Sequence, residues 1–205
     1  MNMNQKDWGL KYRPTSIDDV LLPTELRSKL NKIVNQKGGL SLLFWGRSGC
    51  GKTSVAKLIN PFNTVFINCS TNNSIDMVRW LETEFNCGMV TGGRRLLLLD
   101  EADNLTADAQ AAIRAVSEEL ALHNDFVLTA NDPNKLSEAV RSRFLPVQFD
   151  LSKNEDLIDQ LVTRLDQVAT SEGYPNTDRN VLKGIVERTF PDLRRMIKTL
   201  QFETI

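Results

Sequence analysis

An eight-residue stretch, Gly46-Arg47-Ser48-Gly49-Cys50-Gly51-Lys52-Thr53, constrains this chain more than any other feature. It fits the pattern G-x-x-x-x-G-K-[ST], in which glycines let the backbone curl so that its N–H groups point inward at the start of a helix. The apolar run Leu40–Trp45 before it predicts a buried strand, and Thr53–Ile59 after it predicts a helix. A strand, a glycine-rich loop and a helix in this order predict a site for the phosphates of a nucleotide. The alternative is a glycine-rich turn that binds nothing.

Individual side chains of this loop have expected parts in such a site. Lys52 is expected to reach the β- and γ-phosphates, and the hydroxyl of Thr53 to bind Mg²⁺. Cys50 lies among the loop amides, which could lower its thiol pKa, but a small residue that merely fills the loop is the simpler interpretation. The residues expected to contact the nucleotide are Gly46, Ser48, Gly49, Cys50, Gly51, Lys52, Thr53 and Ser54.

The remaining sequence up to residue 150 alternates predicted strands and helices. This alternation is typical of the α/β class, here a three-layer fold in which helices cover both faces of a five-stranded parallel sheet. After residue 150 the pattern becomes helical, so we expect an αβα domain over 1–150 and a small helical domain over 151–205. The expected strands are 40–45, 64–68, 96–99, 125–130 and 145–149. The expected helices are 24–34, 53–59, 74–85, 107–122, 155–170 (opened by a capping box at 152–155), 177–189 and 191–202.

Composition excludes several classes of protein. The 25 basic and 26 acidic residues exclude a globally basic, histone-like nucleic-acid binder but leave room for a local basic face. Three cysteines exclude a four-cysteine zinc module, and their odd number indicates a reducing compartment. The longest apolar runs are far shorter than the ~20 residues of a membrane span, and no signal peptide follows the first methionine. We therefore expect an intracellular protein without a membrane partner, in the cytoplasm of a bacterial or phage-infected cell or in a eukaryotic nucleus.

Two adjacent acids, Asp100 and Glu101, follow the apolar run 96–99. At the carboxyl end of a buried parallel strand, their side chains are expected to project into the cleft beside the phosphate loop. Asp100 is expected to hold Mg²⁺, directly or through water, and Glu101 to polarise the water that attacks in phosphoryl transfer. The alternative is an exposed acidic turn.

Three further polar residues flank the last two expected strands. Asn131, at the end of the fourth, could hydrogen-bond the attacking water or the γ-phosphate, or could be a turn residue before Asp132-Pro133. Arg141 and Arg143 precede the fifth. Each could be a surface charge or an arginine finger that reaches the nucleotide of a neighbouring subunit.

Taken together, these motifs resemble the AAA+ ATPases of replication clamp loaders over nearly the whole chain. The N-terminal stretch 8–14 is similar to the family's W-x-x-K-Y-R-P box, and 100–114 to its D-E-A-D-x-L/M-T-x-x-A-Q-x-A-L-R stretch. Ser142-Arg143-Phe144 stands where the family has S-R-C. The stretch 190–195 (F-P-D-L-R-R) resembles the family's lid helix, and its sequence is most similar to that of the ATPase subunit of T4-like phages. The resemblance implies a P-loop AAA+ fold with a C-terminal helical lid.

The resemblance also implies roles for residues outside the phosphate loop. Tyr12, Arg13 and Pro14 would lie by the adenine. Arg143 would be a finger acting in trans, and Arg194 the sensor arginine acting on the chain's own nucleotide. The phenylalanine after Arg143 replaces the family's cysteine and leaves the arginine in place.

Four more residues map to positions that couple DNA to hydrolysis. Gln110 matches a glutamine on that route, and Arg114 an interfacial arginine. Asn73 and Ser74 stand where family members often carry a basic residue at the start of the central helix. Here, DNA phosphates would meet amide and hydroxyl donors instead.

In function, the resemblance implies a module that binds ATP and Mg²⁺ and assembles with other clamp-loader subunits. Such assemblies open a sliding clamp and encircle primer–template DNA, contacting its backbone, and matched DNA then triggers hydrolysis. Clamp loaders pentamerise through a helical collar that is missing from this sequence, which indicates either a fragment or a natural short form. Two alternatives stay open: an AAA+ helicase loader or remodelling adaptor, and a structural subunit that binds ATP with little turnover.

Overall fold

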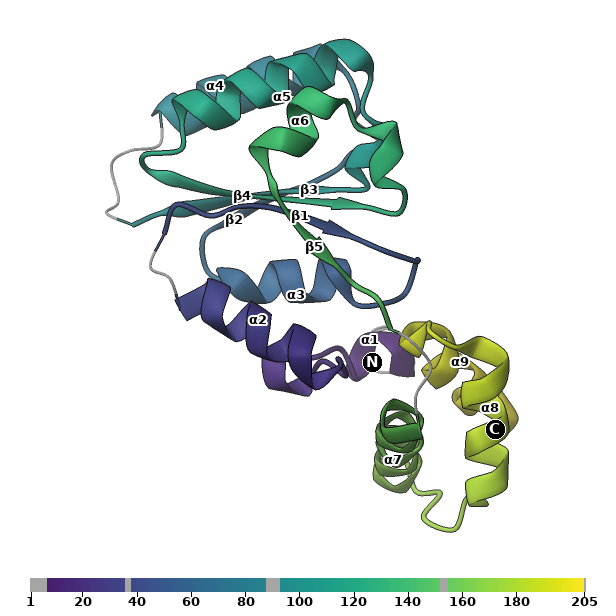
Figure 1. The fold of residues 1–205 in the computed structure, drawn as a ribbon. Coiled ribbons are helices and arrows are strands. Elements are labelled where there is room, and N and C mark those ends of the chain that lie inside the picture. The colour runs from purple at the N-terminus through teal and green to yellow at the C-terminus, as the bar shows by residue number, and fades with distance from the viewer. Residues whose placement is uncertain (1–6, 36–37, 88–92, 152–154, 205) are drawn as a thin grey trace.

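The structure is a computed structural model that describes residues 7–35, 38–87, 93–151 and 155–204 (Figure 1). Its centre is a five-stranded sheet in the order β2-β3-β4-β1-β5, and every neighbouring pair is parallel. The α/β fold expected from the alternation of strands and helices is therefore confirmed. The strands are β1 (Ser41–Trp45), β2 (Thr64–Asn68), β3 (Arg95–Asp100), β4 (Asn124–Ala130) and β5 (Leu145–Gln148).

Helices cover both faces of this sheet, which makes three layers. Figure 1 shows α4 (Ile75–Cys87), α5 (Ala107–Glu119) and α6 (Glu138–Arg143) on one face, and α2 (Thr24–Asn35) and α3 (Lys52–Ile59) on the other. The continuous apolar run of β3 follows from this burial on both sides. Leu97 and Leu99 pack into the core under α4 and α5, whereas Leu96 and Leu98 pack toward α2 and α3.

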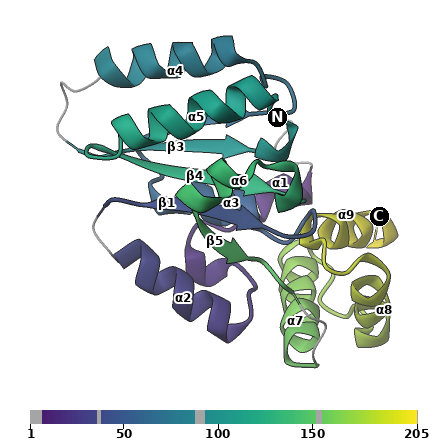
Figure 2. The same cartoon turned by 45° about the horizontal axis from the view of Figure 1, so that its top comes forward.

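A separate hydrophobic core joins α7 (Glu155–Ser171), α8 (Arg179–Thr189) and α9 (Leu193–Thr204) beside the sheet (Figure 2). This core includes Trp8 of the short N-terminal helix α1 (Trp8–Lys11), whose indole is buried and whose backbone N–H donates to Gln201 Oε1 (3.1 Å). The first helix thus packs with the last three, although we expected residues 1–150 to form one domain. The division at residue 150 stays a prediction.

Several helix ends differ from the expected ones. The helix expected from residue 191 begins at Leu193, because the Asp192 carboxylate accepts the N–H of Arg195 (3.0 Å), and Pro191 therefore precedes the helix. The helix expected over 107–122 ends at Glu119. The helices α1 and α6 were missed, since four and six residues are too few to show a helical period. The capping box expected at 152–155 begins outside the described residues. No described helix is long and apolar enough to cross a membrane.

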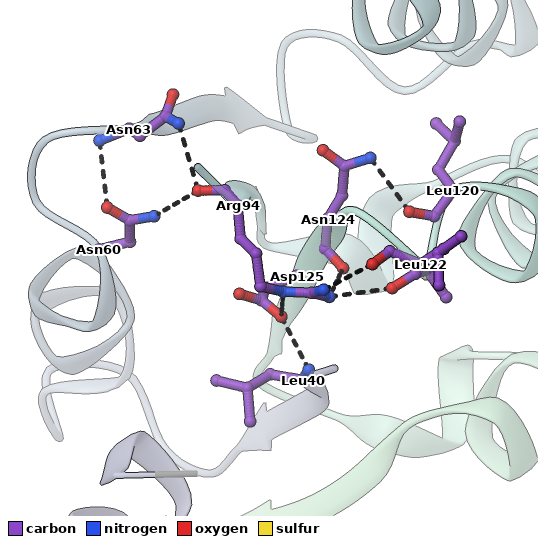
Figure 3. A network of polar contacts seen from close by, with 9 residues as sticks. Leu40, Asn60, Asn63, Arg94, Leu120, Leu122, Asn124 and Asp125 are labelled. Carbon is purple, nitrogen blue, oxygen red and sulfur yellow. Dashed lines mark hydrogen bonds and ion pairs between the residues drawn. The ribbon is translucent and has the colours of Figure 1, made fainter. Parts of the chain in front are cut away.

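A polar network closes the amino ends of the strands (Figure 3). The Arg94 guanidinium donates to Asp125 Oδ1 (3.0 Å) and to three carbonyls at residues 121, 122 and 124, and the same Asp125 oxygen accepts the N–H of Leu40 (2.9 Å). The carbonyl of Arg94 accepts from the amides of Asn60 and Asn63 (3.0 and 3.2 Å). The network ties together the starts of β1, β3 and β4, so that the opposite ends of these strands share one edge.

Candidate active site: a phosphate loop beside two carboxylates

The phosphate loop runs directly from β1 into α3. Gly46, Gly49 and Gly51 have φ values of +149°, +78° and +94°, a region that glycine enters without the strain a side chain would bring. These three residues curl the chain at the start of α3, where the first helical amides lack partners within the helix. Ser48 is exposed in the loop, and Ser54 is half-buried in the first turn of α3.

Lys52 lies within this loop and is almost fully buried. Its ammonium group donates to the carbonyls of Gly46 (2.7 Å) and Arg47 (2.8 Å) and to Asn131 Oδ1 (3.0 Å). The N–H of Gly46 in turn donates to the carbonyl of Ala130 (3.2 Å). The loop and the end of β4 therefore form one side of the site, and the lysine and the asparagine predicted for it are in direct contact.

Thr53 and Asp100 form the second side. The Thr53 hydroxyl donates to Asp100 Oδ1 (2.6 Å), which joins the start of α3 to the end of β3. A hydroxyl and a carboxylate at this separation are hard oxygen donors that suit Mg²⁺. The described residues contain no cluster of three or more His, Cys, Asp or Glu that could hold a metal by itself. Nucleotide phosphates and water would have to supply the other ligands.

Glu101 directly follows β3 and is the one non-glycine residue of the described chain with a positive φ, at 57°. A left-handed backbone at such a residue costs about 1–2 kcal/mol and persists where its surroundings fix it. Its N–H donates to Thr129 Oγ1 (3.0 Å), and its carbonyl accepts the N–H of Asn104 (3.0 Å). The chain therefore turns sharply at Glu101, whose side chain is half-exposed beside Asp100.

Sequence reasoning gives Thr129 no role in this site and makes Asp103 a cap or turn residue, but both side chains organise the site. The carboxylate of Asp103 accepts the backbone N–H groups of Asn131 and Asp132 (both 3.2 Å), which fixes the segment that presents Asn131 to Lys52. The only available signal was the position of each residue, within two or three residues of a predicted site residue.

Among the described residues, the arginines expected to act on phosphate make no hydrogen bond to the phosphate loop. Arg143, on α6, donates to the carbonyl of Ser117 on α5 (2.9 Å), and its buried Nε has no hydrogen-bond partner among the described residues. Arg141 on the same helix is exposed, and so is Arg194 on α9.

Gln110 is a buried side chain that links α5 to the start of α6. Its amide nitrogen donates to the carbonyls of Leu105 (3.2 Å) and Lys135 (3.1 Å), and its oxygen accepts the N–H of Ser137 (2.7 Å). Ser137 is the N-cap of α6, so Gln110 positions the helix that carries Arg143.

The other positions expected to couple to DNA lie on the surface. Arg114 pairs with Glu118 one turn along α5 (3.3 Å), with both side chains about half exposed. Asn73 and Ser74 are exposed just before α4, and the carbonyl of Asn73 accepts the hydroxyl and the N–H of Thr106 (3.2 and 3.1 Å). These contacts leave the Asn73 and Ser74 side chains at the surface.

A sequence profile of the "ATPase family associated with various cellular activities (AAA)" matches residues 42–151. The chain belongs to the AAA family. It is 34% identical to replication factor C small subunit 2 of Pyrobaculum islandicum, over 97% of this chain and 64% of that protein. It is 33% identical to the replication factor C small subunit of Saccharolobus solfataricus, over 95% and 60%. The chain thus spans less than two thirds of these relatives.

Among solved structures, the AAA chain resembles RuvB of Thermotoga maritima. A point mutant of this RuvB has a TM-score of 0.73 at 17% identity, over 93% of this chain and 65% of RuvB. A structure described as the RuvB Holliday junction branch migration motor has a TM-score of 0.69 at 18% identity, over 93% and 64%. At these identities the likeness concerns the fold alone.

Next to the phosphate loop of this AAA chain is a small pocket with mostly apolar walls. It lies where the loop, the segment after η2 (Ile17–Asp19) and the C-terminal helices meet. The lining residues are Val20, Leu21, Gly49, Cys50, Gly51, Leu151, Leu157, Leu161, Pro191 and Leu193.

Tyr12, Arg13 and Pro14, which were expected by the adenine, do not line this pocket. The Tyr12 hydroxyl donates to Glu172 Oε1 at the end of α7 (2.6 Å), and the Lys11 ammonium bonds the same oxygen (2.6 Å). Hydrogen bonds from Lys11 and Tyr12 hold the pKa of Glu172 below its ordinary value. These two bonds hold the N-terminal segment against the C-terminal end of α7.

Cys50 of the phosphate loop is buried, with its sulfur 3.8 Å from Lys52 Nζ. Burial raises the pKa of the Cys50 thiol, and this outweighs the opposing effect of Lys52. The alternative of a lowered pKa is therefore wrong, and the simpler interpretation, a small residue that fills the loop, stays a prediction. Burial, together with the negative charge of Asp100, also raises the pKa of Cys69 to about 12.

Proposed function

We propose that this chain is the ATP-hydrolysing module of a sliding-clamp loader. The observation that carries the ATPase activity is the bond from Thr53 to Asp100 (2.6 Å) beside a buried Lys52. This arrangement joins a phosphate-binding loop to an oxygen site for magnesium. The clamp-loader assignment is supported by the likeness to replication factor C small subunits along nearly the whole chain.

In this proposal, each side of the site has one task. Lys52 and the loop amides bind the phosphates, and Asn131, already bonded to Lys52, orients the terminal phosphate or the attacking water. Thr53 and Asp100 hold Mg²⁺, which supplies positive charge to the transferring phosphoryl group. Glu101 accepts a hydrogen bond from the attacking water and aims it.

The apolar pocket beside the loop accounts for the rest of the nucleotide. Its aliphatic walls suit the faces of an adenine ring. The helices α7–α9 then form a lid, separated from the αβα part near residue 150. Arg194 lies at the start of α9, in the lid that rests on the loop, and we assign it the sensor role for the chain's own nucleotide.

The proposed assembly supplies the remaining positive charge. Arg143 is bonded to α5 rather than to its own phosphate loop, which supports its role as a finger on the nucleotide of a neighbouring subunit. Gln110 holds the start of the helix that carries this finger, so it lies on a physical route from α5 to the neighbouring site. The partners are other loader subunits, the sliding clamp and the backbone of primer–template DNA. The place of action is the cytoplasm of a cell without a nucleus.

The variant Glu101→Gln tests this function against the wild type. We expect Glu101→Gln to bind ATP as tightly as the wild type but to lose turnover, because the amide cannot polarise water in the same way. Phosphate release and binding of a fluorescent ATP analogue are measured with and without a sliding clamp and primed DNA. Glu187→Gln, which changes an exposed acid of α8, is the matched control and is expected to behave as the wild type.

The same experiment separates the alternatives. Clamp and primed DNA should accelerate wild-type phosphate release. ATP that stays intact after long incubation with Mg²⁺, clamp and DNA would instead identify a structural subunit. Binding to a ring-shaped helicase rather than to a clamp would identify a helicase loader.

A further inference from the structure

One buried hydroxyl, that of Thr129, lies between the two carboxylate positions of the site. Thr129 belongs to β4 and is 1% exposed. Its hydroxyl donates to Asp100 Oδ1 (2.7 Å) and accepts the backbone N–H of Glu101 (3.0 Å). A single side chain therefore contacts both the residue proposed to hold magnesium and the residue proposed to aim water.

The direction of these two bonds is fixed by their chemistry. A backbone N–H can only donate, so the Thr129 oxygen is the acceptor toward Glu101. The one proton of the hydroxyl is then left for Asp100. Asp100 Oδ1 thus receives two hydroxyl protons, one from Thr129 and one from Thr53 (2.6 Å), which suits a carboxylate. The oxygen lone pairs of Thr53 stay free for a metal ion.

The bond from Thr129 to Glu101 holds the residue whose backbone has an unfavourable positive φ. Glu101 has a positive φ, and a residue with a side chain returns to the common region of φ unless its neighbours prevent it. Thr129 fixes its N–H, and Asn104 fixes its carbonyl through its backbone N–H (3.0 Å) and its side chain (3.2 Å). The direction in which the Glu101 side chain leaves the strand therefore depends on Thr129.

We propose that Thr129 is a positioning residue for ATP hydrolysis. It sets the position of Asp100 relative to Glu101, and so the position of the magnesium site relative to the attacking water. The inference rests on the proposed ATPase function. It goes further in assigning a role to a buried residue two positions before Asn131, which acts through its bonds to Asp100 and Glu101. A buried threonine with only a structural role would affect stability and leave the magnesium response unchanged.

The test compares Thr129→Val with Thr129→Ser. Valine keeps the shape and removes the hydroxyl, whereas serine keeps the hydroxyl and removes the methyl group. Thr189→Val is the matched control, because Thr189 is also buried and its hydroxyl donates to a carbonyl on its own helix α8, away from the carboxylates (2.6 Å). Thermal unfolding of all variants separates losses of stability from losses of function.

The first readout is binding of a fluorescent ATP analogue over a series of Mg²⁺ concentrations. In EDTA, all variants are expected to bind as the wild type. In Thr129→Val, the Mg²⁺ concentration needed for the half-maximal gain in affinity should rise about 10-fold or more, because Asp100 is no longer held in orientation. Thr129→Ser and Thr189→Val should respond to Mg²⁺ as the wild type.

The second readout is the rate of phosphate release at saturating ATP. Thr129→Val is expected to lower kcat by about 10- to 100-fold with little change in KM, as a displacement of about 1 Å at a reacting group does. Thr129→Ser should restore kcat to within about threefold of the wild type.

The inference is overturned if Thr129→Val matches the wild type in both readouts, or if Thr129→Ser is as impaired as Thr129→Val. Should Thr129→Val fail to fold, Thr129→Ala is compared with Thr129→Ser under the same criteria. If the wild type releases no phosphate with Mg²⁺, clamp and DNA, the proposed ATPase function fails. The Mg²⁺ dependence of nucleotide binding then still decides whether Thr129 positions Asp100.

Discussion

The side chain of Asp192 lies directly against Gly49. A Cβ atom added to Gly49 would overlap Cγ of Asp192, closer than such atoms approach one another in proteins. Asp192 also caps α9 through the N–H of Arg195 (3.0 Å). The helical bundle after residue 155 therefore rests on the phosphate loop at a position where only a residue without a side chain fits.

Gly49→Ala is expected to weaken nucleotide binding and to lower the free energy of unfolding. Alanine brings two costs here, about 1–2 kcal/mol for the left-handed backbone and a further cost for displacing Asp192. Gly39→Ala is the matched control, since Gly39 has a φ of +75° and nothing within 4 Å of an added Cβ. Denaturant unfolding and binding of an ATP analogue are measured for both variants. Equal losses of stability and of affinity in Gly49→Ala and Gly39→Ala would show that the contact with Asp192 contributes nothing.

Arg143→Ala is expected to abolish hydrolysis only where neighbouring subunits complete each other's sites. Losing an arginine finger costs about 10³–10⁵ in rate, whereas a dilute single chain cannot place Arg143 in its own site and should be unaffected. Arg141→Ala, on the same helix but exposed, is the control. Phosphate release is followed over a range of protein concentrations.

A mixing experiment sharpens the prediction for Arg143. Lys52→Ala lacks the phosphate contact but keeps the finger, so mixing it with Arg143→Ala should recover part of the hydrolysis that neither variant shows alone. No recovery in a mixture that demonstrably assembles would contradict action in trans.

Gln110→Ala is expected to lower the free energy of unfolding by about 1–3 kcal/mol, because it removes the three hydrogen bonds that the buried Gln110 side chain makes. Gln148→Ala, at an exposed position of β5, is the control and should change stability little. Denaturant unfolding gives the difference. If the proposed route to Arg143 holds, Gln110→Ala should also lower hydrolysis in the assembly more than in the isolated chain.

Glu172→Gln should remove a stabilisation that depends on pH. Hydrogen bonds from Lys11 and Tyr12 lower the pKa of Glu172 in the folded chain below its ordinary value of 4.5. A lowered folded-state pKa stabilises the fold above the unfolded-state pKa, and this stabilisation disappears as the pH falls through the folded-state value. At pH 7 we expect the variant to be less stable by about 1 kcal/mol or less.

Denaturant unfolding of the wild type and Glu172→Gln between pH 7 and pH 3 checks the sign. The difference between them should narrow below about pH 4.5 and close in stronger acid. Glu187→Gln, which changes an exposed acid of α8, is the control variant in this comparison. A difference in stability that widens in acid would mean that the contacts of Lys11 and Tyr12 with Glu172 do not depend on the charge of Glu172.

Much of this site is local in the sequence and could be predicted from it. Lys52 and Thr53 belong to a glycine-rich pattern that predicts a curled backbone. Asp100 ends an apolar run that predicts a buried strand. The boundaries of β2, 64–68, were predicted to the residue. The missed helices α1 and α6 are short, and neither repeats a hydrophobic period long enough to be recognised.

The sequence by itself determined the order of strands and helices, the phosphate loop and the acids beside it, because each of these depends on residues a few positions apart. Only the tertiary structure decided that Thr129 joins Asp100 to Glu101, that Asp103 holds Asn131, that Asp192 meets Gly49 and that Trp8 packs with α7–α9. The physical reason is that the strands pair in the order β2-β3-β4-β1-β5, which differs from their order along the chain. These contacts form between segments distant in sequence, where no local pattern of residues records them.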